Sequence, residues 1–182
     1  ITDPQVAASL RIGMVHQHFS LVDALTVWEN ILLGDRARLD RKAARDQVVS
    51  IGERYGLTVD PDAEVGHLTA GQRQRVEIIK CLRRDPRILI FDEATSSLDS
   101  HTEHEIIANL REVSAHRTTL VIAHRLSTVV YADEIIVLDD GRIVERGPHD
   151  ALVARGGVYA AMWNRQLRKE DGEDDGLAEV AE

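Results

Sequence analysis

Two adjacent carboxylates, Asp92 and Glu93, directly follow an apolar run at residues 88–91. A short, uninterrupted apolar run is typical of a strand that is buried on both faces of a parallel sheet. The two acids would then lie at the carboxyl end of the strand, where open α/β sheets bind their ligands. In phosphoryl transfer to water, one such acid can hold Mg²⁺ while the other orients or deprotonates the water. The alternative is a strand that simply ends in two solvated acids.

A second candidate site is the segment Leu68-Thr69-Ala70-Gly71-Gln72, which leads into an apolar-striped helix. The free N–H groups and the dipole of a helix N-terminus favour bound anions. Thr69 adds a hydroxyl group, and Gly71 permits a close approach of the backbone to a phosphate. The alternative is an ordinary capped helix.

Histidines offer a weaker hint of a metal site. His16 and His18 flank Gln17, and His101 lies one helical turn before His104. Neither pair has a third ligand at a useful spacing, so we expect surface histidines rather than a metal centre.

The elements that must position these residues alternate between helix and strand, which favours an α/β fold with a mainly parallel sheet. Asp40 and Gly56 are suited to begin and end a helix, Ser100 and Glu103 form a capping box, and Asp140-Gly141 is typical of a two-residue hairpin turn. The expected helices cover residues 3–10, 27–34, 40–56, 69–85, 100–113, 127–131, 149–155 and 158–168, and the expected strands cover residues 12–16, 88–92, 118–123, 135–138 and 142–145.

The composition restricts the class of protein. A chain of 182 residues with 43% hydrophobic and 29% charged residues can form a globular core. No apolar run approaches the roughly eighteen residues of a membrane span, and the single Cys81 excludes a disulfide framework. Residues 170–182 hold seven acids and no base; without them the net charge of −9 falls to −2, which argues against nucleic-acid binding.

With these residues in place, the chain resembles the nucleotide-binding domain of ATP-binding cassette (ABC) transporters, over nearly its whole length except the acidic tail. Five motifs occur in that family's order. They resemble the Q-loop glutamine (Gln17), the signature (residues 68–72), Walker B with the catalytic glutamate (residues 88–92 with Glu93), the D-loop (Ser97-Leu98-Asp99) and the switch histidine (His124).

The resemblance implies an ATPase with a P-loop NTPase-like fold that uses ATP and Mg²⁺. Asp92 and Gln17 would serve the metal, Glu93 would polarise the attacking water, and His124 would contact the γ-phosphate. Nucleotide-binding residues would be Thr69, Ala70, Gly71, Gln72 and Asp99, which in the family close over ATP held by the opposite subunit of a head-to-tail dimer.

The resemblance also implies partners, a location and a division of the chain. A transmembrane permease would contact the Q-loop region and hold the domain at the cytoplasmic, inner face of the plasma membrane. The domain would cover residues 1–168, with a helical signature subdomain at 27–84, and an α/β core with a C-terminal hairpin and helices at 1–26 and 85–168. Residues 169–182 would form a disordered acidic tail.

The chain departs from the family in three ways. The phosphate-binding motif Gly-x-x-x-x-Gly-Lys-Ser/Thr does not occur: the three lysines are Lys42, Lys80 and Lys169, and none follows a glycine. Together with a first residue that is not Met, this predicts an N-terminal truncation, with a missing strand that leaves a neighbour of the Asp92 strand unpaired. Ala70 stands where the family most often has Gly, from which we expect a modest effect.

The third departure is a mosaic character. Residues 12–82 resemble the ATPases of simple-sugar and nucleoside importers, whereas residues 88–167 resemble exporters of the iron–sulfur or heavy-metal type. The leading hypothesis is therefore an ABC ATPase domain without its phosphate-binding loop. Two alternatives stay open: a non-catalytic partner that supplies the signature and D-loop in trans to a complete subunit, and a chain with no stable fold.

Overall fold

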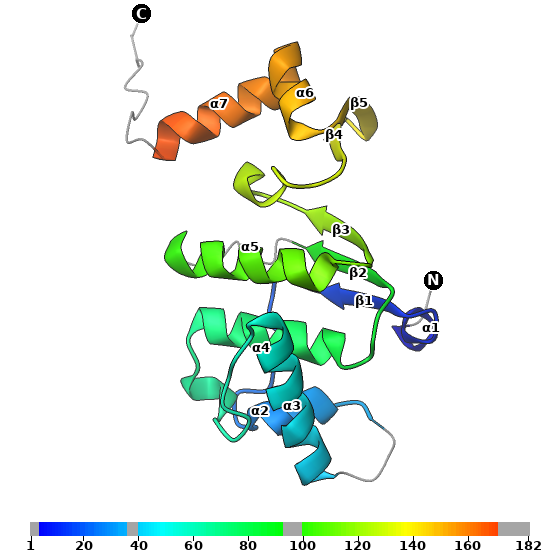
Figure 1. The fold of residues 1–182 in the computed structure, drawn as a ribbon, viewed down its shortest axis with the longest axis vertical. Helices are drawn as coiled ribbons and strands as arrows, with labels where there is room; N and C mark the ends of the chain where they lie inside the picture. Colours follow the sequence, from blue (N-terminus) through cyan, green and yellow to red (C-terminus); the bar gives the residue numbers. More distant parts are fainter. Residues whose placement is uncertain (1–3, 36–39, 93–99, 171–182) are drawn as a thin grey trace, which may run out of the picture. The chain divides into compact units, whose positions relative to one another are not determined.

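The computed structural model describes residues 4–35, 40–92 and 100–170, so that Glu93 and Asp99 lie outside the described residues, as do the side chains of the predicted Ser100–Glu103 capping box. The chain divides into two compact units, residues 1–122 and 123–182, each described by itself below. Figure 1 shows the order of their elements.

The first unit contains a parallel sheet in the order β1-β2-β3, formed by β1 (Ile12–Val15), β2 (Ile88–Asp92) and β3 (Thr118–Ile122). The register places Val15 of β1 beside Phe91 of β2, and Asp92 beside Ile122 of β3. The strand that ends in Asp92 is therefore the central one. Its neighbours β1 and β3 each pair with β2 alone within the described residues, and the missing strand stays a prediction.

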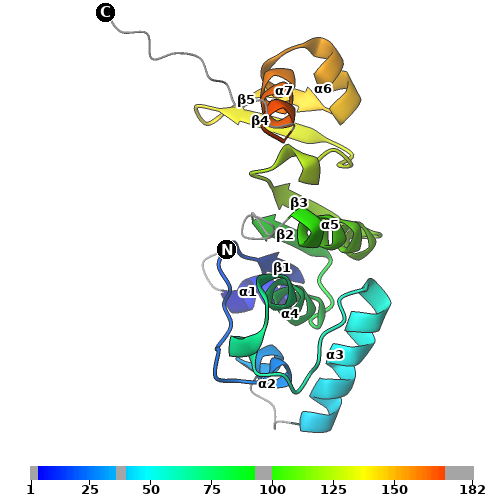
Figure 2. The same cartoon turned by 90° about the vertical axis from the view of Figure 1, so that its left-hand side faces the viewer.

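Only one face of this sheet is fully buried. Val15, Leu89 and Phe91 are at most 1% exposed and join a core that α4 (Ala70–Leu82) and α5 (Ser100–Ser114) complete. Figure 2 shows these two helices alongside the sheet. On the other face, Leu120 and Ile122 of β3 keep 53% and 46% of their surface exposed. The prediction of a strand buried on both faces is thus wrong for the described residues, because the residues of β2 alternate between a covered and an uncovered face.

Two further helices, α2 (Val27–Leu32) and α3 (Arg41–Tyr55), pack against each other and against α4. Asp40 caps α3 by accepting a hydrogen bond from the backbone N–H of Ala43, and Gly56 ends it with a left-handed backbone at φ +67°. Both ends of α3 confirm the sequence prediction. The 3₁₀ turn Val65–His67 precedes α4, and the short helix α1 (Pro4–Ser9) precedes β1.

The second unit contains an antiparallel hairpin and two helices. Strands β4 (Ile135–Asp139) and β5 (Arg142–Gly147) are joined at Asp140 and Gly141, both with positive φ, as expected for the predicted tight turn. The predicted helix at 127–131 is instead a 3₁₀ turn at Leu126–Thr128. Helices α6 (His149–Arg155) and α7 (Val158–Glu170) follow the hairpin, so residues 169 and 170 of the predicted tail belong to a helix.

A buried carboxylate of β5 binds the start of α7 in this second unit. Glu145 is 8% exposed and accepts hydrogen bonds from the backbone N–H groups of Val158 (3.2 Å) and Tyr159 (2.7 Å) at the start of α7. The negative charge thereby satisfies free donors at a helix N-terminus. Among the described residues, no helix has the length and apolar character that crossing a membrane requires.

Candidate functional site

Asp92 and Gln17 follow adjacent strands of the sheet at the same edge. Asp92 is the last residue of β2 and is half-buried, whereas Gln17 comes two residues after the end of β1 and is exposed. Because Val15 and Phe91 are register partners in parallel strands, both side chains start from the carboxyl edge. Mg²⁺ takes oxygen ligands and is usually held by one or two carboxylates together with waters and substrate phosphates, so the Asp92 carboxylate suits the metal that the sequence predicts, and the Gln17 amide oxygen can add to it.

The signature segment forms the N-terminus of α4, with Thr69 as its N-cap. The hydroxyl oxygen of Thr69 accepts from the backbone N–H of Gln72 (3.3 Å), and the side chain of Gln72 accepts from the N–H of Thr69 (3.0 Å). Thr69 and Ala70 are exposed, Gln72 is half-buried and Gly71 is buried. This exposed helix start, with its partial positive charge, can receive an anion.

The other three predicted site residues do not belong to the described part of the first unit. His124 is exposed and belongs to the second unit, while Glu93 and Asp99 lie outside the described residues. His16 and His18 are exposed, as expected for surface histidines, whereas the side chains of His101 and His104 lie outside the described residues.

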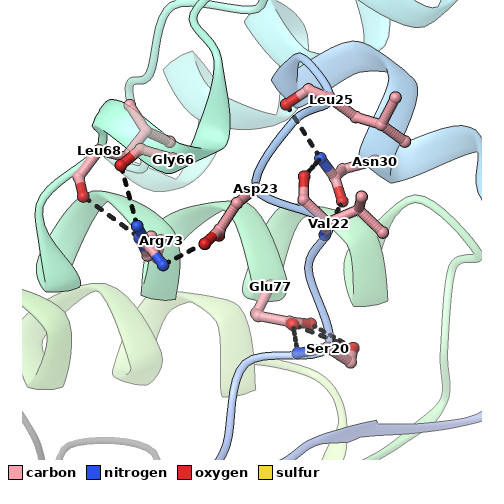
Figure 3. Close-up of polar contacts among 9 residues, drawn as sticks. All are labelled: Ser20, Val22, Asp23, Leu25, Asn30, Gly66, Leu68, Arg73 and Glu77. Atoms are coloured by element: carbon pink, nitrogen blue, oxygen red, sulfur yellow. Dashed lines mark hydrogen bonds and ion pairs between the residues drawn. The ribbon is translucent and has the colours of Figure 1, made fainter.

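Two charged residues of α4 that motif reasoning did not single out bind the segment after Gln17 (Figure 3). Glu77 is 6% exposed and accepts hydrogen bonds from the backbone N–H and the hydroxyl group of Ser20. Arg73, one turn earlier, donates to Asp23 (3.1 Å). The sequence did carry a signal, because a lone carboxylate between Val76 and Ile78 in a buried helix face needs a partner.

Asn30 fixes the same segment from α2. Its side chain is fully buried, and its oxygen accepts from the N–H of Val22 (2.8 Å). Its amide group donates to the carbonyl oxygens of Val22 and Leu25 (Figure 3) and of Thr26, at 3.0–3.3 Å. Every polar atom of this buried side chain is thus satisfied, which a polar group in a core requires.

Two side chains of the first unit have shifted pKa values. Burial raises the pKa of the Cys81 thiol to about 12, and the nearby Glu77 carboxylate adds to the effect. Hydrogen bonds from the hydroxyl group and the backbone N–H of Thr26 lower the pKa of Glu29, which lies in the first turn of α2. The thiol therefore stays protonated at neutral pH, whereas Glu29 is ionised.

A family model described as "ABC transporter" matches residues 3–96, more than half of the chain. The human "ATP-binding cassette sub-family B member 6" is 40% identical over 95% of the chain and 22% of its own length. An "ATM1-type heavy metal exporter" from Novosphingobium aromaticivorans is 42% identical over 89% of the chain and 28% of its own length. The chain thus spans less than a third of the length of these relatives.

Solved structures agree. "Structure of a bacterial Atm1-family ABC exporter with ATP bound" matches 90% of the chain and 30% of its own chain, with a TM-score of 0.73 and 38% identity. The chain belongs to the ABC transporter family, and its α/β architecture is that of the family's P-loop NTPase-like ATPase domain. These exporter relatives agree with the prediction for residues 88–167; the importer-like character of residues 12–82 stays a prediction.

Proposed function

We propose that this chain forms part of an ATP-hydrolysing nucleotide-binding domain that powers transmembrane transport. The observation that carries the proposal is the position of Asp92 at the carboxyl end of the central parallel strand, with Gln17 after the adjacent strand. Family membership supports ATP as the nucleotide and Mg²⁺ as its metal.

The side chains would divide the reaction between them. Asp92 and Gln17 would hold the metal, and Glu93 would take up the proton of the attacking water. His124 would donate a hydrogen bond to the γ-phosphate. The signature residues Thr69 to Gln72, together with Asp99, would close over a nucleotide held by a second ATPase subunit, because an exposed helix N-terminus is suited to a phosphate from outside its own unit.

The triphosphate also needs a cradle of backbone N–H groups and a lysine, and residues 1–182 contain no Gly-x-x-x-x-Gly-Lys-Ser/Thr motif. The chain by itself should therefore bind ATP weakly and hydrolyse none. A calorimetric titration with MgATP tests this expectation. Micromolar affinity, or turnover that Glu93→Gln abolishes, would contradict it.

A gain-of-function experiment tests the site itself. The chain is fused to the preceding phosphate-loop segment of a bacterial exporter of the Atm1 family, and ATPase activity is measured. We expect turnover that Asp92→Asn and Glu93→Gln each reduce at least about a hundredfold. The exposed Glu53 of α3 provides a control, since Glu53→Gln should keep the activity. Turnover that survives in both acid variants would reject the assigned roles.

A second candidate function is a non-catalytic partner that supplies Thr69–Gln72 and Asp99 in trans. The exposure of Thr69 and Ala70 at the start of α4 favours it. A pull-down with a complete ABC ATPase subunit separates the two functions: ATP-dependent association without restored turnover supports the partner, and failure to associate with and without ATP rejects it. In either function a transmembrane permease would hold the chain at the inner face of the plasma membrane through the segment around Gln17.

A further inference from the structure

All three polar groups of Ser20 are bound by two side chains of α4. Glu77 accepts from the backbone N–H of Ser20 and from its hydroxyl group, the latter at 3.0 Å (Figure 3). Lys80, one turn further along α4, donates to the carbonyl oxygen of Ser20 (2.9 Å) and to its hydroxyl oxygen (3.2 Å). We call Ser20, Glu77 and Lys80 the Ser20 latch.

The Ser20 latch buries a charged group at a thermodynamic cost. Glu77 is 6% exposed, and a carboxylate in such a position is destabilising unless it is hydrogen-bonded and near a positive charge. Ser20 satisfies the Glu77 carboxylate through its backbone N–H and its hydroxyl group, so the carboxylate fixes the position of this residue, which follows Gln17 by three residues.

A second set of hydrogen bonds connects the same segment to residues 66–68, at the beginning of the signature. Arg73 donates to the carbonyl oxygens of Leu68 (3.2 Å) and Gly66 (3.1 Å) and to the carboxylate of Asp23. The backbone N–H of Gly66 in turn donates to the carbonyl oxygen of Asp23 (2.8 Å). Residues 20–25 are thus held to α4 at Glu77 and to the signature end of α4 at Arg73.

From this arrangement we propose that Glu77, Lys80 and Arg73 are positioning residues that couple the Gln17 segment to the signature segment. The proposal rests on the proposed function for the roles of Gln17 and Thr69–Gln72, but the coupling itself is a property of this chain. Val15 is fixed in β1 and Ser20 is fixed to α4, so only residues 16–19 connect the two anchors. A displacement of α4 relative to β1 would therefore act on Gln17 through a connection of four residues, and by reciprocity a contact at Gln17 would bias α4.

Native-state hydrogen exchange of the 182-residue chain tests the coupling without any nucleotide. We expect residues 20–25 and 66–73 to open together, with the same dependence of exchange on low denaturant concentration. Glu77→Ala should speed exchange in residues 20–25 at least tenfold while exchange in α3 and in the second unit stays unchanged. Different denaturant dependences of the two segments in the unaltered chain would overturn the proposal.

Matched variants separate positioning from a general loss of stability. Ser20→Thr keeps the hydroxyl group and should preserve slow exchange, whereas Ser20→Ala should speed it, and Glu53→Gln on the exposed face of α3 should change nothing. A uniform acceleration across both units in Glu77→Ala would also overturn the proposal. Because no step of this test uses ATP, turnover of the fused chain that survives in both acid variants would reject the proposed roles of Asp92 and Glu93 and leave the exchange result intact.

Discussion

Thr69 and Gln72 cap each other at the start of α4, through two hydrogen bonds that run in opposite directions between their side chains and backbone N–H groups. The residues expected to meet a phosphate thus themselves satisfy two backbone N–H groups at this helix terminus. A phosphate contact would compete with these bonds, so helix stability and anion affinity can be separated by substitution.

Gln72→Glu should separate the two properties. A carboxylate at this position keeps the acceptor for the N–H of Thr69 and favours the positive helix end, so the free energy of unfolding should stay equal or rise by up to about 1 kcal/mol. Its negative charge should nevertheless weaken ATP-dependent association with a complete ATPase subunit. Urea unfolding and the pull-down measure the two effects, and Gln72→Ala serves as the control that loses the cap. Unchanged association in Gln72→Glu would show that this helix end does not meet phosphate.

Asn30→Asp should strongly destabilise the first unit. The substituted carboxylate can still accept from the N–H of Val22, but it places an oxygen against the carbonyl groups of Val22, Leu25 and Thr26. We expect a loss of about 3 kcal/mol or more, because a buried charge then lacks its donors. This loss is measured by urea unfolding, with the fluorescence of Trp28 on α2 as the signal and Trp163→Phe as the background.

The same chemical change at Asn109 is the control for this prediction. Asn109 is half-buried and donates to the carbonyl oxygen of Gly56 (3.2 Å). Asn109→Asp loses a single hydrogen bond and should cost about 1 kcal/mol. Equal losses in the two variants would contradict the special role of Asn30.

Gly157→Ala should destabilise the second unit through Glu145. A Cβ atom built on Gly157 would lie 1.7 Å from an oxygen of the Glu145 carboxylate, so the side chain would have to leave the N–H groups at the start of α7. We expect a loss of about 2 kcal/mol, measured by the fluorescence of Trp163 in a Trp28→Phe background. In a Glu145→Ala background the same substitution should cost little, and a cost that persists there would show a different cause.

Residue patterns predicted helix ends and the hairpin turn well, and the polar contacts between distant segments less well. Asp40, Gly56 and Asp140-Gly141 act through local backbone geometry, so their roles could be inferred from short stretches of sequence. The exposed face of β3 could not be predicted, because an apolar strand does not reveal which elements cover it. Glu77 was missed because its partner Ser20 lies 57 residues away in the sequence.

Cys81 provides the final prediction, because its pKa of about 12 lies well above the usual value of 9.0. The thiol lines a cavity of about 580 Å³ with Ser20, Glu77 and Lys80 but stays protonated at pH 8. Since a higher pKa also makes the thiolate a better nucleophile, alkylation by iodoacetamide should be roughly 30- to 60-fold slower than in the unfolded chain.

The same shift has a consequence for stability at high pH. The folded state binds the thiol proton more tightly than the unfolded chain does. The resulting contribution to the free energy of unfolding is complete below pH 9 and is lost as the pH rises toward 12. Urea unfolding of the unaltered chain should therefore show a decline above pH 9 that is smaller in Cys81→Ala. Alkylation at the same rate in folded and urea-unfolded chain, or identical pH profiles in the two proteins, would contradict burial as the cause.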